Sequence, residues 1–544
     1  MKIGIGQINT TTGDFDGNCK KILDAALRLK ELGADCAVFS ELALCGIYPK
    51  DKVFSRKFLE KNSECLEVLA RDLPIPAFVG FVRSESGALD ARNSIAFLEG
   101  GKVNTFYDKH LLPNYGIFRD KRYFDKGTQI CIVEFKGKRI GLTICEDIWS
   151  ADTDTAKFYD GEVIPLELLA KENLDVLINA SASLWSPENE AARAELLPNV
   201  ARSVNASLVY CNSIGGNDDM VCAGGSVVLN SRGEYCECLS KFKEDLRVVD
   251  LENLNAQGLS EFEKIPEMYD ALVMSLGDFV RKSGFSKVLL GLSGGIDSAL
   301  VATLAADALG AENVTGIALP SKYSSDHSRR DAGDLAKNLG IKFETIAIAD
   351  LVASAETALA PMFAGRAPDL TEENLQSRSR ALLLMAISNK FDAMLLSTGN
   401  KSECAVGYAT LYGDTCGGFA PIADVYKTDV FALSKYANKN GERIPLNTII
   451  KPPSAELRPD QKDSDSLPEY DILDAILYAY IEGGKSANDI IAAGFDASVV
   501  YDVIKKFERT EYKRKQLAPA PRLSIRSLGN DKLSALTDKK SYEF

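Results

Sequence analysis

The sequence predicts an α/β protein built from two domains. Its 544 residues exceed what a single hydrophobic core usually serves, which indicates two large domains. In the second half, apolar strand-like runs alternate with helical stretches, and this alternation predicts a doubly wound parallel sheet. The first half predicts two sheets flanked by helices. The expected boundaries are residues 1–252, a polar linker over 253–266, and residues 267–544.

The composition narrows the class of protein. A hydrophobic content of 46% and a charged content of 26% are typical of a globular protein without a membrane span, and no run of about 18 apolar residues occurs. A net charge of −14 argues against nucleic-acid binding. Twelve scattered cysteines without a CxxC pair predict reduced thiols and a cytoplasmic location. With only His110 and His327 present, nucleophile activation must rest on other groups.

The first half contains a series of short strands and amphipathic helices. Strands are expected at 2–8, 36–41, 77–82, 93–99, 102–107, 129–135, 139–145, 175–181, 207–214 and 245–251, with a further hairpin over 224–240. Helices are expected at 16–32, 55–72 and 188–205. Three of these strands run into residues with reactive side chains, namely Glu41, Lys109 and Cys145. A nearby ammonium favours the thiolate and a carboxylate can take the thiol proton. Glu and Lys can therefore replace histidine as the activators of a cysteine nucleophile, and Lys109 can also stabilise an oxyanion.

The sequence blocks around these three residues carry a family resemblance. FSELALCG, YDKHLLPNYGIF and GLTICEDIW resemble the nitrilase superfamily over about the first 250 residues. The resemblance implies an αββα sandwich and a Glu-Lys-Cys triad that cleaves amides. For members that use glutamine, it implies that Tyr115 and Ser183 contact this substrate. The chain departs from the family pattern after Ser183, where Leu184 replaces a proline and Asn189 stands at a usually basic position.

A glycine-rich turn at the start of the second half is the most informative stretch of the chain. KVLLGLSGGIDSALVATLAADA, residues 287–308, reads as a buried strand, a turn and a helix. Backbone N–H groups of such a turn and the helix N-terminus bind phosphate, serine hydroxyls add donors, and Asp297 can hold Mg²⁺. The turn lacks the lysine of GxxxxGK[ST]. SGGIDS instead resembles the loop of ATP pyrophosphatases, which cleave ATP to AMP and pyrophosphate.

The remaining elements of the second half extend this unit. Helices are expected near 267–283, 326–339, 350–362 and 371–390, and strands at 288–292, 314–319, 343–348 and 393–397. Ligands of doubly wound sheets bind beyond the carboxyl ends of the strands. The loops PSKYSSDHS and TGNKSE follow two of these strands, as SGGIDS follows another. SGGIDS alone leaves GMP synthesis, asparagine synthesis, tRNA thiolation and NAD synthesis open.

Further blocks favour one of these chemistries. LPSKYSSDHSRRDA, ENLQSRSRALLLMAISN, LSTGNKSECAVGY, KPPSAELRPDQKDSDSLPEYDILD and EYKRKQ resemble the NAD synthetase family, and with the amidase region the chain resembles its glutamine-dependent members. The resemblance assigns ATP to Gly291, Leu292, Ser293, Gly294, Gly295, Ile296, Asp297, Ser298, Thr398, Lys427 and Ser454. It assigns deamido-NAD to Asn374, Arg378, Glu403 and Lys513, and Mg²⁺ to Asp297 and Glu403.

The resemblance implies a reaction and a set of partners. ATP would activate the carboxylate of nicotinic acid adenine dinucleotide as an acyl-adenylate, and ammonia from L-glutamine would convert it to NAD. An enclosed passage would carry the ammonia, so little should escape during turnover. The family implies a homo-oligomer built on a synthetase-domain dimer. Two alternatives stay open: amidation of another carboxylate by the same two-domain plan, and a regulatory nucleotide-binding protein with inactive sites.

Overall fold

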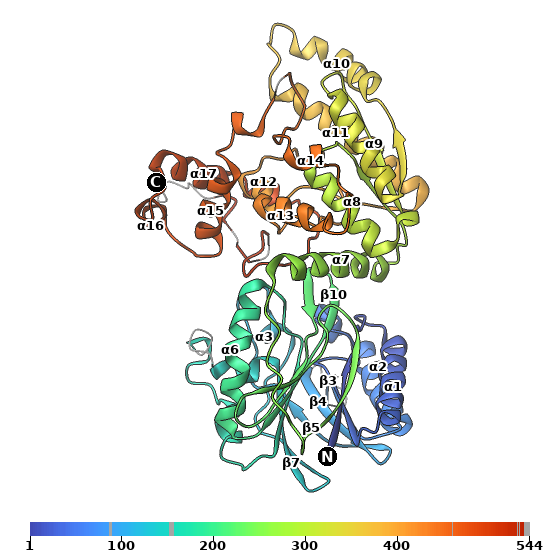
Figure 1. Cartoon of the computed structure of the whole chain (residues 1–544), viewed down its shortest axis with the longest axis vertical. Helices are drawn as coiled ribbons and strands as arrows, with labels where there is room; N and C mark the ends of the chain where they lie inside the picture. The colour runs from blue at the N-terminus through green and yellow to red at the C-terminus, as the bar shows by residue number, and fades with distance from the viewer. Residues whose placement is uncertain (86–89, 152–156, 460, 530, 533, 538–544) are drawn as a thin grey trace. The chain divides into compact units, whose positions relative to one another are not determined.

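The computed structural model forms two compact units, Met1–Phe262 and Glu263–Phe544 (Figure 1). It describes residues 1–85, 90–151, 157–459, 461–529, 531–532 and 534–537. Among these residues, no helix is both long enough and apolar enough to cross a lipid bilayer.

The N-terminal unit contains two six-stranded sheets. The first has the order β14-β1-β2-β3-β4-β5 and the second the order β13-β12-β9-β8-β7-β6. The first sheet consists of β1 (Lys2–Gln7), β2 (Cys36–Phe39), β3 (Ala77–Arg83), β4 (Arg92–Glu99), β5 (Lys102–Asp108) and β14 (Asp245–Asp250). The second consists of β6 (Ile132–Phe135), β7 (Lys138–Ile144), β8 (Val176–Ser181), β9 (Ser207–Asn212), β12 (Val227–Leu229) and β13 (Tyr235–Cys238).

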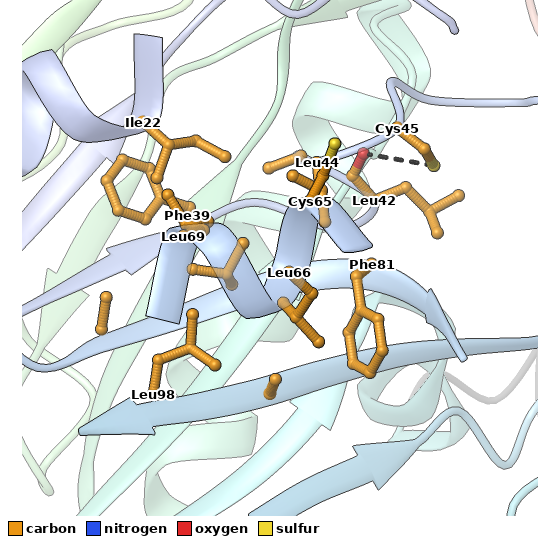
Figure 2. Close-up of a cluster of buried hydrophobic side chains, with 14 of the residues drawn as sticks. Ile22, Phe39, Leu42, Leu44, Cys45, Cys65, Leu66, Leu69, Phe81 and Leu98 are labelled. Atoms are coloured by element: carbon orange, nitrogen blue, oxygen red, sulfur yellow. Dashed lines mark hydrogen bonds between the residues drawn. The ribbon is translucent and has the colours of Figure 1, made fainter. Parts of the chain in front are cut away.

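Three apolar cores define four layers in this unit. The helices α1 (Phe15–Glu31) and α2 (Arg56–Asp72) bury Ile22 and Leu69 against the first sheet, where Phe39 and Leu98 meet them (Figure 2). A second core lies between the two sheets. The third joins the outer face of the second sheet to α5 (Pro165–Leu169) and α6 (Pro187–Val204). This arrangement confirms the predicted αββα sandwich.

Strand directions bring two candidate residues to one edge of the first sheet. β2 and β3 are parallel, β3 and β4 are antiparallel, and β4 and β5 are antiparallel, so β2 and β5 point the same way. The segments that follow these two strands therefore leave the sheet at the same edge, and they carry Glu41 and Lys109. In the other sheet, β7 ends directly before Cys145.

The C-terminal unit contains one four-stranded sheet in the order β17-β16-β15-β18, with all strands parallel. Its strands are β15 (Val288–Gly291), β16 (Val314–Ala318), β17 (Lys342–Thr345) and β18 (Met394–Leu395), and the helices α7 (Lys264–Lys282), α8 (Ile296–Leu309), α9 (Asp326–Leu339), α10 (Ala349–Phe363) and α11 (Leu370–Phe391) connect or precede them. The chain starts in the middle of the sheet and returns to its other side, which confirms the predicted doubly wound topology.

Some regular structure has no counterpart in the sequence prediction, namely the short helices α3 (Asp120–Tyr123) and α5 and two larger regions. In the first unit, the predicted strand 207–214 ends early and a hairpin of β10 (Ile214–Asn217) and β11 (Met220–Ala223) follows. In the second unit, seven helices follow β18, namely α12 (Lys401–Val406), α13 (Lys427–Ala437), α14 (Leu446–Ile450), α15 (Tyr470–Ile481), α16 (Ala487–Ala492), α17 (Ala497–Arg509) and α18 (Glu511–Arg514). Helices α12, α15, α16 and α17 share a separate apolar core.

Candidate active sites

The structure brings Glu41, Lys109 and Cys145 together in a buried site of the N-terminal unit. Lys109 Nζ lies 2.9 Å from Glu41 Oε1, and the exposed fraction of each side chain is 6% or less. Lys109 also forms an ion pair with Asp120, whose Oδ2 lies 2.9 Å from Nζ. The charges of Glu41 and Lys109 act on the pKa of the Cys145 thiol. The charges of Asp120 and Glu41 act on the pKa of Lys109. A bound amide in this site could therefore meet a base (Glu41), an ammonium group (Lys109) and a sulfur nucleophile (Cys145).

The pKa of Cys145 is raised well above its ordinary value. Burial is the main cause, the Glu41 carboxylate adds to the rise, and the Lys109 ammonium opposes it. The resting nucleophile is therefore a neutral thiol, and attack on an amide requires that its proton be removed as the bond forms. Burial lowers the pKa of Lys109, but Asp120 and Glu41 outweigh it, so this side chain stays a cation.

The backbone at Cys145 is in the left-handed region, with φ = +41°. Non-glycine residues rarely adopt this conformation, and such strain clusters at functional sites. Cys145 stands between the end of β7 and the 3₁₀ helix η2 (Cys145–Ala151). Asp147 supports this turn, since its carboxylate accepts hydrogen bonds from Ile144 N at 2.9 Å and from Leu111 N at 2.9 Å.

The predicted glutamine contacts lie beside this site. Tyr115 donates a hydrogen bond of 2.6 Å to Glu146, the residue after the nucleophile, and its ring stacks on Phe158. Ser183 is buried and follows Ala182, whose N–H donates to Glu41 Oε2 at 2.8 Å. Asn189 uses its side chain locally, because Nδ2 donates to the Leu184 carbonyl. Its amide therefore braces the start of α6.

Glu146 has an unusual protonation equilibrium. Burial raises its pKa to about 7, although hydrogen bonds from Tyr115 and Tyr159 favour the charged form. Between pH 4.5 and 7 the folded chain therefore holds a proton that the unfolded chain releases, so Glu146 makes stability fall as pH rises. Glu146→Gln should remove this slope and flatten the thermal unfolding midpoint of the N-terminal unit between pH 5 and 8. The effect at pH 8 is expected to reach about 3 kcal/mol at most.

In the C-terminal unit, the glycine-rich turn joins the end of β15 to the start of α8, over Gly291–Ser298. Gly294 has φ = +80°, and a Cβ there would lie 2.3 Å from the Ser328 carbonyl oxygen, so a side chain does not fit. Ser293 Oγ accepts from the N–H of Gly295 at 3.1 Å and lies 3.2 Å from Ser298 Oγ. Ile296 is the first residue of α8 and one of its eleven buried residues. Ser293 and Ser298 thus hold the turn together through their hydroxyl groups.

Thr398 belongs to the same edge of the sheet. β18 pairs with β15 in the register Val288↔Met394 and Leu289↔Leu395. Because the two strands are parallel, the segment after β18, which carries Thr398, leaves the sheet at the same edge as the glycine-rich turn after β15. Position and residue type suit a contact with a nucleotide bound beyond the strand ends.

Asp297 and Glu403 converge on the buried ammonium of Lys427. Lys427 Nζ lies 2.5 Å from Asp297 Oδ2 and 3.0 Å from Glu403 Oε1. Asn400 Nδ2 donates to Asp297 Oδ1 at 2.9 Å. Burial raises the pKa of Glu403 to about 7, while Lys427 opposes the rise. The Lys427 pKa is also raised, because its two carboxylate partners outweigh burial.

The donor set at Asp297 and Glu403 fits Mg²⁺. Mg²⁺ prefers hard oxygen ligands, and proteins often bind it through one or two carboxylates plus substrate phosphates. The described residues hold no cluster of three or more metal-ligating Asp, Glu, His or Cys side chains. Two carboxylates beside the glycine-rich turn therefore match a metal shared with a nucleotide better than a fully protein-bound ion.

Three of the four residues assigned to deamido-NAD contact one loop, residues 407–414. Asn374 Oδ1 accepts from Thr410 Oγ1 at 2.8 Å, and Arg378 Nε donates to the Leu411 carbonyl at 3.1 Å. Lys513 Nζ donates to the Gly407 and Ala409 carbonyls, each at 2.7 Å. Three polar side chains thus meet at one loop. The fourth residue, Glu403, faces Lys427 instead.

The structure places Ser454 in a different setting from the other ATP residues. Its hydroxyl donates to the Gln461 carbonyl within its own loop. Glu456 from the same loop accepts hydrogen bonds from Ser325 and Ser328, and Ser328 packs against Gly294. Ser454 is thus connected to the glycine-rich turn through neighbouring residues.

Sequence reasoning missed several residues of these sites. Asp120, Asn93 and the Ala182 N–H contact the charged pair of the first site, and Asn400 contacts Asp297. Asp120 lies two residues past the block YDKHLLPNYGIF. This closeness to a family motif was the one feature of the sequence that could have indicated it. No feature of the sequence could have indicated Asn93 and Ala182, because 52 and 141 residues of chain separate them from Glu41.

Two family models and several known proteins match this chain. The carbon-nitrogen hydrolase family model matches residues 2–257, and the NAD synthase model matches residues 268–517. The glutamine-dependent NAD(+) synthetase of Synechocystis sp. is 44% identical over 97% of each chain, and that of Thermotoga maritima is 41% identical over 99% of each. The solved structure of the Acinetobacter baumannii enzyme in complex with ADP superposes with a TM-score of 0.77, at 38% identity over 98% of each chain.

The fold and the comparisons define an enzyme of the carbon–nitrogen ligase class that joins an amidase unit to a synthetase unit. The chain belongs to the glutamine-dependent NAD(+) synthetase family. The family resemblance of the sequence blocks is thereby confirmed.

Proposed function

We infer that this chain makes NAD from deamido-NAD, ATP and L-glutamine. The observation that carries the inference is the full-length similarity to glutamine-dependent NAD(+) synthetases, with both family regions present. Glu41, Lys109 and Cys145 are present and buried together in the first unit, and SGGIDS forms the turn between β15 and α8 in the second. These features argue against a regulatory protein with inactive sites.

The first half-reaction takes place in the N-terminal unit. Cys145 attacks the side-chain amide of glutamine while Glu41 removes the thiol proton, and Glu41 then gives that proton to the departing ammonia. Lys109, held as a cation by Asp120 and Glu41, stabilises the oxyanion. Tyr115 and Ser183 orient glutamine. Water, activated by Glu41, hydrolyses the thioester to glutamate.

The second half-reaction takes place in the C-terminal unit. The carboxylate of deamido-NAD attacks the α-phosphate of ATP, and pyrophosphate leaves into the turn Gly291–Ser298. Asn374, Arg378 and Lys513 bind deamido-NAD. Lys427 balances charge near the phosphates, and Thr398 contacts ATP. Ammonia then attacks the acyl-adenylate and releases AMP.

A magnesium ion is part of this proposal. Asp297 and Glu403 would hold it, and when bound it neutralises charge on the phosphates. Removal of divalent cations with EDTA is expected to stop AMP release and NAD formation while glutamine hydrolysis continues. Added Mg²⁺ should restore synthesis. Synthesis that persists at full rate in EDTA would contradict a metal at this position.

One assay tests the overall reaction. Purified protein is incubated with deamido-NAD, MgATP and glutamine, and AMP, NAD and glutamate are measured. Equal amounts of the three products are expected, with little free ammonia if an enclosed passage carries it. AMP release that requires a different acid from a panel of carboxylates would favour the alternative amidation. Absence of both AMP release and glutamate would contradict the proposal.

We also propose that the chain forms a homo-oligomer through the C-terminal unit. Helix α10 is rich in apolar residues, yet none of its residues is buried. Met362, Leu382 and Phe391 are also at least 60% exposed on α10 and α11. Exposed apolar surface of this kind marks interaction sites. Leu382→Glu is expected to lower the mass measured by light scattering, and an unchanged mass would count against this face.

We also propose that the protein is located in the cytoplasm. All twelve cysteines are free thiols, which suits a reducing environment. Fractionation of cells with an antibody against the chain would test it.

A further inference from the structure

Asn93, near the start of β4, contacts two members of the candidate triad. Its side-chain Nδ2 donates a hydrogen bond of 2.7 Å to Glu41 Oε1. Its backbone carbonyl accepts a hydrogen bond of 2.8 Å from the N–H of Lys109. Asn93 is 2% exposed, so both contacts are shielded from water. One residue thus ties the base to the strand end that carries the ammonium.

The orientation of the Asn93 amide follows from its surroundings. If the amide were reversed, its oxygen would lie 2.7 Å from a carboxylate oxygen, which is repulsive. In the observed orientation Oδ1 is buried and finds no hydrogen-bond donor among the described residues. A buried acceptor without a donor costs stability. The donor on Glu41 is kept in spite of that cost, which indicates a functional role.

The donors around Glu41 fill its two oxygens unequally. Each carboxylate oxygen can accept about two hydrogen bonds. Among the described residues, Oε1 accepts from Asn93 Nδ2 and from Lys109 Nζ, and is therefore full. Oε2 accepts from Ala182 N at 2.8 Å and has one acceptor position left. A proton can join Glu41 at Oε2 without displacing a donor.

We propose that Asn93 is a positioning residue that fills Oε1 together with Lys109, so that Oε2 of Glu41 is the atom that takes the proton of Cys145. The inference rests on the proposed glutaminase function of this site. Oε2 accepts a hydrogen bond of 2.8 Å from the N–H of Ala182, and a backbone hydrogen bond from Ala182 also lowers the pKa of the Cys145 thiol. This shared donor favours Oε2, the oxygen with a free acceptor position, as the one that receives the proton.

The proton and the electrons balance through one cycle. The S–H electron pair forms the bond from sulfur to the amide carbon, the proton moves to Oε2, and the carbonyl pair moves to oxygen. When the oxyanion collapses, the C–N bond breaks and the same proton moves from Oε2 to nitrogen, so neutral ammonia leaves. Asn93 and Lys109 keep donating to Oε1 throughout, which holds the carboxyl group in one orientation.

The pH dependence of glutamine-driven NAD formation tests the role of Asn93. Asn93→Ala removes one of the two donors that hold Oε1 of the base. Asn93→Ala should move the acidic limb of kcat/KM for glutamine upward by roughly one pH unit and lower its plateau about tenfold. The aspartate in Asn93→Asp has the shape of asparagine but places an anion beside Glu41. The acidic limb of kcat/KM should therefore move to higher pH than in Asn93→Ala.

Asn62→Ala is the matched control. Asn62 is also a buried asparagine of this unit and hydrogen-bonds the backbone of Val82, without contacting Glu41. This variant should lower the unfolding midpoint and leave the acidic limb in place. Ammonia-driven NAD formation should stay at the wild-type level in all three variants.

Two outcomes would overturn the inference. One is a fall in activity of Asn93→Ala with the acidic limb unmoved, and the other is an equal shift in Asn62→Ala. If Asn93→Ala does not fold, the isosteric Asn93→Asp carries the test, and an unmoved limb there has the same meaning. A wild-type chain without glutamine-driven synthesis would instead refute the proposed function, so the two failures are distinguishable.

Discussion

Cys145→Ala is expected to abolish glutamine-driven NAD formation and leave ammonia-driven formation near the wild-type rate. Alanine has no nucleophile, so no thioester can form, and loss of a catalytic nucleophile typically costs 10⁴-fold or more. The C-terminal unit has its own core and its own candidate site, so it needs only ammonia from solution. Parallel assays of NAD formation with glutamine and with ammonium chloride measure both activities.

Cys65→Ala is the control for this substitution. Cys65 is a buried thiol on α2 of the same unit, and its removal tests the effect of losing a buried sulfur as such. It should leave glutamine-driven synthesis unchanged apart from stability. If Cys145→Ala lost both activities while remaining folded, the assignment of one half-reaction to each unit would be wrong.

The fold was largely predictable because its strands are short, apolar and bounded by turn residues. β1, β3, β8 and β15 are almost entirely buried, and their short length and bounding turn residues distinguish them from the neighbouring helices. The hairpin β10–β11 was missed because Ile214–Asn217 includes two glycines and little β-branched sequence. The helices after β18 were missed because several are only four to six residues long.

Some residues of the candidate sites could be predicted from the sequence, and others could not. Glu41, Lys109 and Cys145 follow predicted strands, so their convergence could be expected from sheet topology. The donors that complete the site come from elsewhere in the chain: Asp120 from a four-residue helix, and Asn93 from inside a strand. Their roles depend on hydrogen-bond partners far away in sequence, and a sequence pattern does not record such partners. Lys427 was predicted near phosphates, but its bridge between Asp297 and Glu403 required the structure.

Asp297→Asn is expected to lower NAD formation from both glutamine and ammonia by about 10³-fold, because one of the two carboxylates that would hold a cation on the phosphates is lost. The amide keeps the shape of the carboxylate and can still accept from Asn400, but it cannot neutralise Lys427 or bind a cation as strongly. Glutamine hydrolysis should be the activity that remains, measured as glutamate. Asp307→Asn, on the same helix and paired with Arg443, is the matched control and should leave synthesis intact. Normal AMP release from Asp297→Asn would exclude this carboxylate from adenylate formation.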